Sequence, residues 1–259
     1  MRVFEFSNAI VREPGESVVK GLKSDPAAMP SYAGVLAEHR AYVHALAEAG
    51  LAVDILPPLE TFPDSVFVED PALVFSEGAI LLRPGAPSRL AERDEMRNAL
   101  ARHFATVLEL GAGENADGGD VLVTPVAVYI GLSKRTNRLG AQALAKKLAE
   151  LGHAANIVET PPSALHLKSA AALVNEDTLI ATKSLAGMFE GLRVLVTPEG
   201  EEAAANLVRV NHTVLLPAGF PRTADLIAQE GLEARFLNVS DVAKLDAGLS
   251  CMSLRWAKV

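Results

Sequence analysis

Cys251 is the only cysteine in the 259-residue sequence and the side chain with the greatest nucleophilic potential. It lies in the segment LSCMSL, directly after Ser250 and at the end of an irregular DAGLS stretch. A lone cysteine in an apolar segment is more often an inert packing residue than a nucleophile. The polar neighbours and the break in the apolar pattern favour a cysteine that faces a cleft, where its thiolate could attack an electrophilic carbon.

His166 is the candidate proton-transfer partner. It lies between two leucines in LHLKS, where a hydrogen-bonded histidine of the core or of an edge strand is the simpler interpretation. An imidazole titrates near neutral pH, so this residue is also suited to act as general acid and base. The remaining histidines fall mostly on predicted helices or turns, and none has metal-ligand spacing. A single cysteine allows neither an internal disulfide nor a cysteine-based zinc site.

Two segments bring carboxylates into apolar surroundings. FPDSVFVEDP (62–71) contains Asp64, Glu69 and Asp70, and DGGDVL (117–122) places Asp117 and Asp120 on a glycine-rich turn before a strand. Carboxylates buried there would need hydrogen-bonding or ionic partners, whereas solvated loops would need none. The second segment lacks the spacing of a dinucleotide-binding loop and the lysine of a phosphate-binding loop.

Two arginines occupy corresponding places in successive repeats. Arg89 lies in RPGAPSR and Arg135 in GLSKRTN, each where a predicted strand leads towards a helix. Solvation of a helix start would explain either residue alone. Their recurrence favours a pair of guanidinium groups that bind a carboxylate.

The elements that position these residues repeat along the chain. Pairs of short apolar runs are each followed by an amphipathic helix and another strand, which predicts ββαβ units. The expected elements are strands 71–75 and 78–85, helix 88–104 and strand 105–110; strands 120–124 and 127–133, helix 137–152 and strand 155–160; strands 171–175 and 178–182, helix 184–190 and strand 193–198; strands 206–211 and 212–219, helix 221–230 and strand 234–240. We expect Ser88 to cap its helix.

The chain ends supply a fifth unit. Strand 249–256 would pair with strand 2–10, followed by helix 31–49 and strand 51–58. One flat sheet of so many strands would enclose a poor core, so the units are expected to be arranged around an axis. The sequence therefore predicts a five-bladed α/β propeller as one domain over residues 1–259.

The bulk composition narrows the function classes. The net charge of −8 argues against a nucleic-acid-binding protein, which needs a basic face. No apolar run approaches the roughly 18 residues of a membrane span, and the N-terminus lacks a signal-peptide core. We expect a cytoplasmic protein with a small-molecule substrate and without nucleic-acid or membrane partners. Pairing of edge strands into a homodimer is allowed by the fold but not required.

Six of these segments, in order along the chain, resemble the dimethylarginine dimethylaminohydrolase family of the guanidine-modifying (pentein) superfamily. They are PDSVFVED, RPGAPSR, DGGDVL, GLSKRTN, LHLKS and KLDAGLSCMS, which run from residue 63 to residue 253. REPGESVVKGLKS, near the N-terminus, is similar to the family's substrate-covering loop. The resemblance implies a five-bladed propeller, in agreement with the repeat pattern. It also implies hydrolysis of Nω-methylated arginines to citrulline and dimethylamine or methylamine.

The resemblance also implies residue roles. The nucleophile would be Cys251, which forms a covalent thiouronium; His166 would transfer protons, and Asp117 would orient it, although some relatives have glutamate there. Asp70 would hold the guanidinium, and the further substrate contacts implied are Leu22 through its backbone, Asp64, Phe67, Glu69, Arg89, Arg135, Leu245 and Asp246. No metal or organic cofactor is expected.

Three alternatives remain open from the sequence. An arginine deiminase or a citrulline hydrolase would use the same cysteine, histidine and acid on the same scaffold. A non-catalytic, ribosome-associating propeller would share the architecture, but it would have no use for Cys251 and His166 together. Such a protein would also suit a basic surface better than a net charge of −8.

Overall fold

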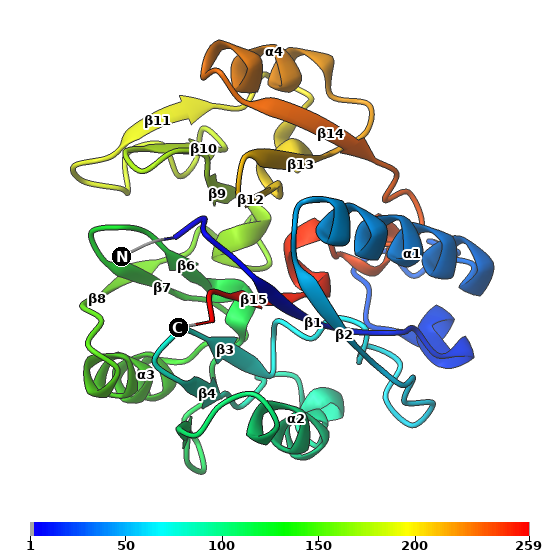
Figure 1. The fold of residues 1–259 in the computed structure, drawn as a ribbon, viewed down its shortest axis with the longest axis vertical. Coiled ribbons are helices and arrows are strands. Elements are labelled where there is room, and N and C mark those ends of the chain that lie inside the picture. The colour runs from blue at the N-terminus through cyan, green and yellow to red at the C-terminus, as the bar shows by residue number, and fades with distance from the viewer. Residues whose placement is uncertain (1–2, 259) are drawn as a thin grey trace.

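The computed structural model describes residues 3–258, whose strands form five three-stranded sheets (Figure 1). In each sheet the middle strand is antiparallel to one neighbour and parallel to the other. The sheets are β15 (Leu254–Trp256), β1 (Asn8–Arg12), β2 (Ala52–Leu56); β3 (Ala72–Val74), β4 (Ala79–Leu81), β5 (Val107–Glu109); β6 (Val121–Val123), β7 (Val128–Leu132), β8 (Ala155–Glu159); β9 (Ala171–Leu173), β10 (Thr178–Ala181), β11 (Arg193–Val196); β12 (Val208–Val210), β13 (Thr213–Pro217), β14 (Glu233–Leu237).

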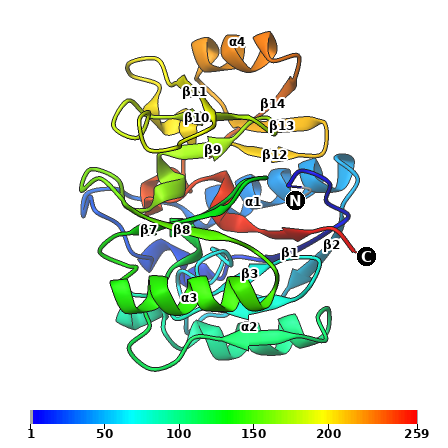
Figure 2. The same cartoon turned by 90° about the vertical axis from the view of Figure 1, so that its left-hand side faces the viewer.

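Four helices connect a middle strand to its outer neighbour and lie on the periphery of the molecule (Figures 1 and 2). They are α1 (Tyr32–Glu48), α2 (Glu92–Ala101), α3 (Arg138–Glu150) and α4 (Pro221–Gln229). The short strands β15, β3, β6, β9 and β12 lie innermost, since β3 contacts β15 and β9 contacts both β6 and β12. The predicted five-bladed propeller of ββαβ units is confirmed.

The chain ends close the propeller as the sequence predicts. β15, near the C-terminus, pairs antiparallel with β1, and Ile10 lies opposite Leu254 in this ladder. The predicted strand began at residue 2, which lies outside the described residues. The observed strand starts at Asn8. Because the first and last strands share one sheet, the cysteine segment is held against the N-terminal part of the chain.

Local sequence explains where the helices begin and end. The Asn137 side chain accepts a hydrogen bond from the Gly140 N–H at the start of α3, and Gly152 adopts a φ of +87° just beyond its end. Leu144 and Leu148 on the buried face of α3 pack into the same core cluster as Ile130 of β7. None of the helices in residues 3–258 is long and apolar enough to cross a membrane.

Two helix predictions are wrong. Residues 184–190 form turns closed by i to i−3 hydrogen bonds, such as that from the Leu185 N–H to the Thr182 carbonyl. A segment this short, with Gly187 inside it, cannot offset the cost of helix nucleation. Ser88 caps no helix: it lies in a 3₁₀ turn, Pro87–Arg89, and α2 begins at Glu92. The Arg89 side chain turns inward to Asp70 and Glu92 and fixes that turn.

The cysteine segment is not a strand, contrary to the prediction for residues 249–256. Leu249–Met252 forms a 3₁₀ turn, and β15 begins only at Leu254. The turn is held by hydrogen bonds from the Ser250 N–H to Asn206 Oδ1 and from the Glu69 N–H to the Cys251 carbonyl. These partners lie outside any β-ladder, so the backbone at Cys251 is irregular and can face a cavity.

Candidate active site

The candidate residues converge because each lies in an irregular segment that leads into an innermost strand. Asp70 precedes β3, Asp117 precedes β6, His166 precedes β9 and Cys251 precedes β15. These four segments lie at the same end of the propeller, since Asp70, His166 and Cys251 line one cavity and Asp117 is bonded to His166. The repeated architecture therefore brings side chains from four blades to one place.

These segments enclose a cavity of about 210 Å³. Its lining contains every residue that the sequence assigned to the site except Asp117 and Glu69. The lining residues are Leu22, Lys23, Ser24, Asp64, Phe67, Asp70, Arg89, Arg135, Leu165, His166, Leu245, Asp246, Ala247 and Cys251. Of these, Lys23, Ser24, Leu165 and Ala247 were not predicted, although each lies inside one of the segments that resemble the family. The cavity is of a size suited to a free amino acid rather than a polypeptide.

Asp117 supports His166 from behind the cavity wall. His166 Nε2 lies 3.1 Å from Asp117 Oδ2, and Asp117 is fully buried. The other Asp117 oxygen, Oδ1, accepts a hydrogen bond of 2.6 Å from the Gly85 N–H. Gly119 permits this packing, because a Cβ there would lie 2.7 Å from His166 Nδ1. The carboxylate is therefore held in place and can orient the imidazole.

The surroundings of His166 favour its protonated form. Burial alone would lower its pKa, but the hydrogen bond to Asp117 and the charges of Asp70 and Asp120 outweigh burial and raise the pKa to about 9. Asp120 is itself buried and bonded to Ser133, Thr136 and the Leu167 N–H. At neutral pH the imidazole is therefore a proton donor.

Cys251 is in the opposite situation. It is half-buried and lines the cavity, and burial, followed by the charges of Glu69 and Asp70, raises its pKa to about 12. The neutral thiol is thus the stable form in the empty site. Formation of a thiolate requires a positive charge that offsets the two carboxylates, and a cationic ligand would supply one.

Asp70 and Arg89 form a buried ion pair in the lining of the cavity. Arg89 Nη1 donates to Asp70 Oδ2, while its Nε and Nη2 bind Glu92 and its Nη2 also reaches the Phe67 carbonyl at 2.9 Å. Burial would raise the pKa of Asp70, but Arg89 and then His166 hold it below its usual value. Glu92, seen in the sequence only as a helix residue, is thus the second partner of Arg89.

Arg135 and the N-terminal loop also contribute to the lining of the cavity. The Arg135 guanidinium is half-buried and makes no hydrogen bond or ion pair with any residue in the described range 3–258. Asp64 Oδ1 accepts a hydrogen bond of 2.9 Å from the Leu22 N–H, so the N-terminal loop lies over the site. Ser24 continues this closure, since its hydroxyl donates to Asp246 Oδ1 at 2.8 Å.

Glu69 is adjacent to Asp70 in sequence but lies on the far side of the wall. Lys168 Nζ donates to its Oε1 at 2.5 Å, and the Ser250 hydroxyl donates to its Oε2 at 3.3 Å. It lines a second, larger cavity and not the one that contains Cys251. The position of Glu69 is therefore suited to act on the cysteine from behind and not to contact a ligand in front of it.

Three of these groups are close enough to share a cation. One ligand atom each from Asp70, Asp117 and His166 lie within 4.8 Å of one another. Both acids already have partners, because Asp70 pairs with Arg89 and Asp117 binds His166 and the Gly85 N–H. Positive charge from Arg89 and from the imidazolium therefore accounts for this cluster.

Comparison with known proteins agrees with this geometry. A family model described as Arginine deiminase matches residues 37–217. An N(G),N(G)-dimethylarginine dimethylaminohydrolase from Pseudomonas aeruginosa is 38% identical over 254 residues, which cover 97% of this chain and 100% of the relative.

Two solved structures are similar over nearly their whole length. A mutant Pseudomonas aeruginosa enzyme of this family, complexed with citrulline, matches with a TM-score of 0.94 at 38% identity and covers 97% of this chain and 100% of that one. A mutant dimethylarginine dimethylaminohydrolase in an adduct with S-methyl-L-thiocitrulline matches with a TM-score of 0.93 at 38% identity, over 96% and 99% of the two chains. The present chain therefore belongs to the dimethylarginine dimethylaminohydrolase family of the pentein superfamily and is a hydrolase that acts on guanidino groups.

Proposed function

We propose that this protein hydrolyses Nω-methylated arginines, asymmetric dimethylarginine and monomethylarginine, to citrulline and dimethylamine or methylamine. The observation that carries the proposal is one amino-acid-sized cavity lined by a thiol, an imidazole and a carboxylate: Cys251, His166 and Asp70. The full-length similarity to dimethylarginine dimethylaminohydrolases, including one bound to citrulline, supports this choice of substrate.

The charges of the cavity match the two ends of such a substrate. Asp70 can accept hydrogen bonds from a guanidinium beside the thiol, because a carboxylate has about four acceptor sites. Arg89 occupies one site on Oδ2, and the Gly119 N–H occupies one on Oδ1. Asp64 and Arg135 lie in the same cavity and would bind the α-amino and α-carboxylate groups. One of the two Nη1 hydrogens of Arg89 has no partner in residues 3–258, and it could donate to the α-carboxylate of the substrate.

The reaction begins with activation of Cys251. A guanidinium beside the thiol offsets the charge of Asp70 and thereby lowers the high thiol pKa. The thiolate attacks the guanidinium carbon, and a tetrahedral adduct forms. His166, protonated because of its raised pKa, donates a proton to the methylated nitrogen, and the neutral amine leaves. A covalent thiouronium on Cys251 remains.

Hydrolysis of the thiouronium uses His166 in the reverse direction. The neutral imidazole takes a proton from water, and the hydroxide adds to the same carbon. Collapse of this second adduct expels the sulfur as a thiolate and releases the hydroxyl proton to water, which leaves the carbonyl of citrulline. Asp117 stabilises the imidazolium that results, because its carboxylate accepts from the ring. An adduct of a related enzyme with S-methyl-L-thiocitrulline supports chemistry of this kind.

Product analysis tests the proposal directly. Incubation with asymmetric dimethylarginine, monomethylarginine, arginine and citrulline in parallel, followed by mass spectrometry, should show citrulline formed from the methylated substrates with release of the corresponding amine. Cys251→Ser should abolish turnover while the thermal unfolding temperature stays near that of the wild type, since the two side chains are nearly the same size. Full activity of that variant would refute the nucleophile.

Arginine deiminase is the second candidate, because the family model of that description covers residues 37–217. Its activity would appear in the same experiment as preferential consumption of arginine with release of ammonia. The dimethylarginine relatives favour the first candidate, since their similarity extends over almost the entire chain.

A further inference from the structure

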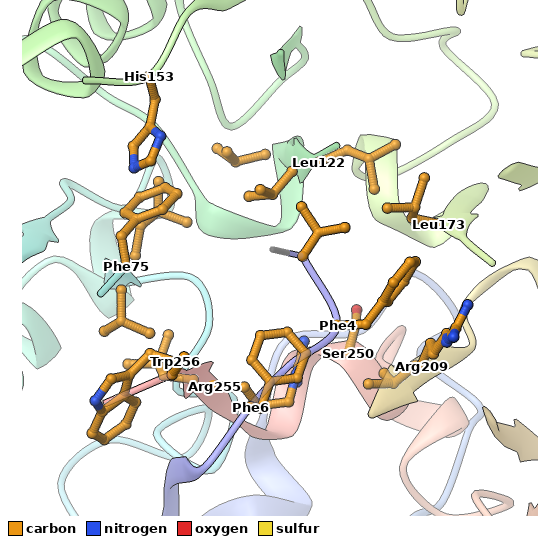
Figure 3. Close-up of a pocket in the computed structure, with 18 of the residues that line it drawn as sticks. Phe4, Phe6, Phe75, Leu122, His153, Leu173, Arg209, Ser250, Arg255 and Trp256 are labelled. Atoms are coloured by element: carbon orange, nitrogen blue, oxygen red, sulfur yellow. The ribbon is translucent and has the colours of Figure 1, made fainter. Parts of the chain in front are cut away.

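A second cavity, of about 840 Å³, lies on the other side of the wall formed by the segments 69–70 and 250–251. Glu69 and Ser250 line this second cavity, whereas Asp70 and Cys251 line the catalytic pocket. Phe4, Phe75, Leu122 and Leu173 contribute to the largely apolar lining of the second cavity, and Ser250 lies among them (Figure 3). Its lining extends to the surface at Val126, which is 61% exposed. Within residues 3–258 the two cavities share no lining residue, so water in the larger cavity need not pass through the catalytic pocket.

A continuous line of polar contacts crosses the wall between the two cavities. Ser250 Oγ lies 3.9 Å from Cys251 Sγ and 3.3 Å from Glu69 Oε2. Lys168 Nζ donates to the other oxygen of Glu69 at 2.5 Å. Cys251 lines the catalytic pocket, whereas Ser250, Glu69 and Lys168 line the larger cavity.

The thiol proton needs such a route. In the occupied pocket, His166 already carries the proton that the leaving amine requires, and Asp70 faces the guanidinium. The substrate also displaces water from a volume of only about 210 Å³. Ser250 Oγ is an acceptor in contact with the sulfur, and it lies on the side away from the substrate.

We propose that Ser250 and Glu69 form a proton relay that accepts the proton of the Cys251 thiol and connects the catalytic pocket to the larger cavity. This inference rests on the proposed role of Cys251 as nucleophile. The S–H proton moves to Ser250 Oγ while the Ser250 hydroxyl proton moves to Glu69 Oε2, which leaves a thiolate and a neutral carboxylic acid. The proton returns by the same path when the thiolate is expelled at the end of the cycle.

The environment of Glu69 suits it to hold a proton transiently. Burial raises its pKa, while Lys168 and Arg255 act in the opposite direction and Asp70 adds to the rise. Lys168, Arg255 and Asp70 face the relay from the surrounding segments, together with His166 beside Asp70 and with Tyr42, whose own pKa Glu69 helps to raise. Lys168 fixes the carboxylate on one oxygen and leaves the other directed to Ser250.

The relay makes opposite predictions for two observables in Glu69→Gln. Loss of the carboxylate charge lowers the Cys251 pKa, so alkylation of the free enzyme by iodoacetamide at pH 7.5 should become faster. Turnover of asymmetric dimethylarginine should nevertheless fall by about 10²-fold, because the proton acceptor is missing. A purely electrostatic role of Glu69 predicts that both rates rise together, and this result would overturn the relay.

Ser250 variants test the middle of the relay, with Ser253→Ala as the matched control. Ser253 lines the same cavity and is buried, but its hydroxyl bonds to Tyr42 and Arg255 and makes no hydrogen bond with Cys251. Ser250→Ala should lower kcat by about 10²-fold at pH 7 with partial recovery at higher pH, while KM stays within about threefold. Ser250→Thr should restore most of kcat, and Ser253→Ala should leave it within about threefold.

The outcomes separate the relay from the proposed function. A wild-type protein that fails to convert any methylated arginine refutes the proposed function. An active wild type with Ser250→Ala equally active, or with Ser250→Thr no better than Ser250→Ala, refutes the relay alone. Because Ser250 and Glu69 are tested separately, misfolding of one variant leaves the other as a decisive measurement.

Discussion

Replacement of Asp117 by asparagine should separate two contributions of this acid to catalysis. Asp117 is fully buried, its Oδ2 lies 3.1 Å from His166 Nε2, and this contact is the largest of the effects that raise the His166 pKa to about 9. Asparagine keeps the shape but removes the charge. We expect the pKa of His166 to fall towards its ordinary value of 6.5.

The size of the effect depends on pH in a defined way. At pH 7.5 an imidazole with a pKa of about 9 is about 97% protonated, whereas one with a pKa of about 6.5 is only about 10% protonated. The supply of the proton-donating form therefore falls by up to about tenfold at pH 7.5 and hardly at all at pH 5.5. Any loss of kcat/KM that remains at pH 5.5 measures the misorientation of the ring.

The assay is the pH profile of kcat/KM for asymmetric dimethylarginine, recorded for the wild type, Asp117→Asn and Asp117→Glu, because kcat/KM reports the pKa values of the free enzyme. The glutamate variant keeps the negative charge and serves as the control. In the asparagine variant the alkaline limb should move from near pH 9 towards pH 6.5. An alkaline limb that stays in place, with kcat/KM reduced by one constant factor at every pH, would refute the electrostatic role assigned to Asp117.

Two further predictions use other groups of the site. Arg135→Ala should raise KM by about 10- to 100-fold with little change in the unfolding temperature, because the Arg135 guanidinium has no partner in residues 3–258. Arg89→Ala should instead destabilise the protein by about 3–5 kcal/mol, because it leaves the buried carboxylates of Asp70 and Glu92 without a counter-charge. Thermal melts and KM values of both variants check this contrast. His166 has a folded-state pKa of about 9, above its unfolded value of 6.5, so its stabilising contribution is complete below pH 6.5 and is lost as pH rises through 9. Urea unfolding of the wild type between these values should therefore lose up to about 3 kcal/mol relative to His166→Gln, and equal pH slopes would contradict the raised pKa.

The fold was predictable because the same pattern is written in the sequence several times. Each repeat places two short apolar runs before a helix or turn and a third strand, and an error in one unit does not disturb the others. The segment 184–190 shows this, since turns replace the predicted helix while β10 and β11 still pair in parallel. Predictions from local sequence were wrong where tertiary contacts dominate. At Ser88, for example, the predicted helix cap does not form, because the adjacent Arg89 side chain turns inward to Asp70.

The residue types of the candidate site were predictable from the sequence, but the protonation states of their side chains were not. Asp117 and Asp120 were predicted to lie on a glycine-rich turn before a strand, and the structure shows that Gly119 of this turn makes room for the His166 ring. The direction of the His166 pKa depends on burial opposed by Asp117, Asp70 and Asp120, which come from two different segments. A sequence gives no distances between such segments, so it does not reveal whether the pKa of His166 is raised or lowered.

The charges of the adjacent residues Glu69 and Asp70 on Cys251 restrict which substrates can react. Both raise the pKa of Cys251, but Lys168 pairs with Glu69 behind the wall, and Asp70 faces the cavity. A cationic guanidinium in the cavity offsets the charge of Asp70 and promotes the thiolate. The ureido group of citrulline is neutral and brings no such charge, so we expect it to leave Cys251 as an unreactive thiol. The same carboxylate that selects the substrate would thereby keep the nucleophile from acting on the product.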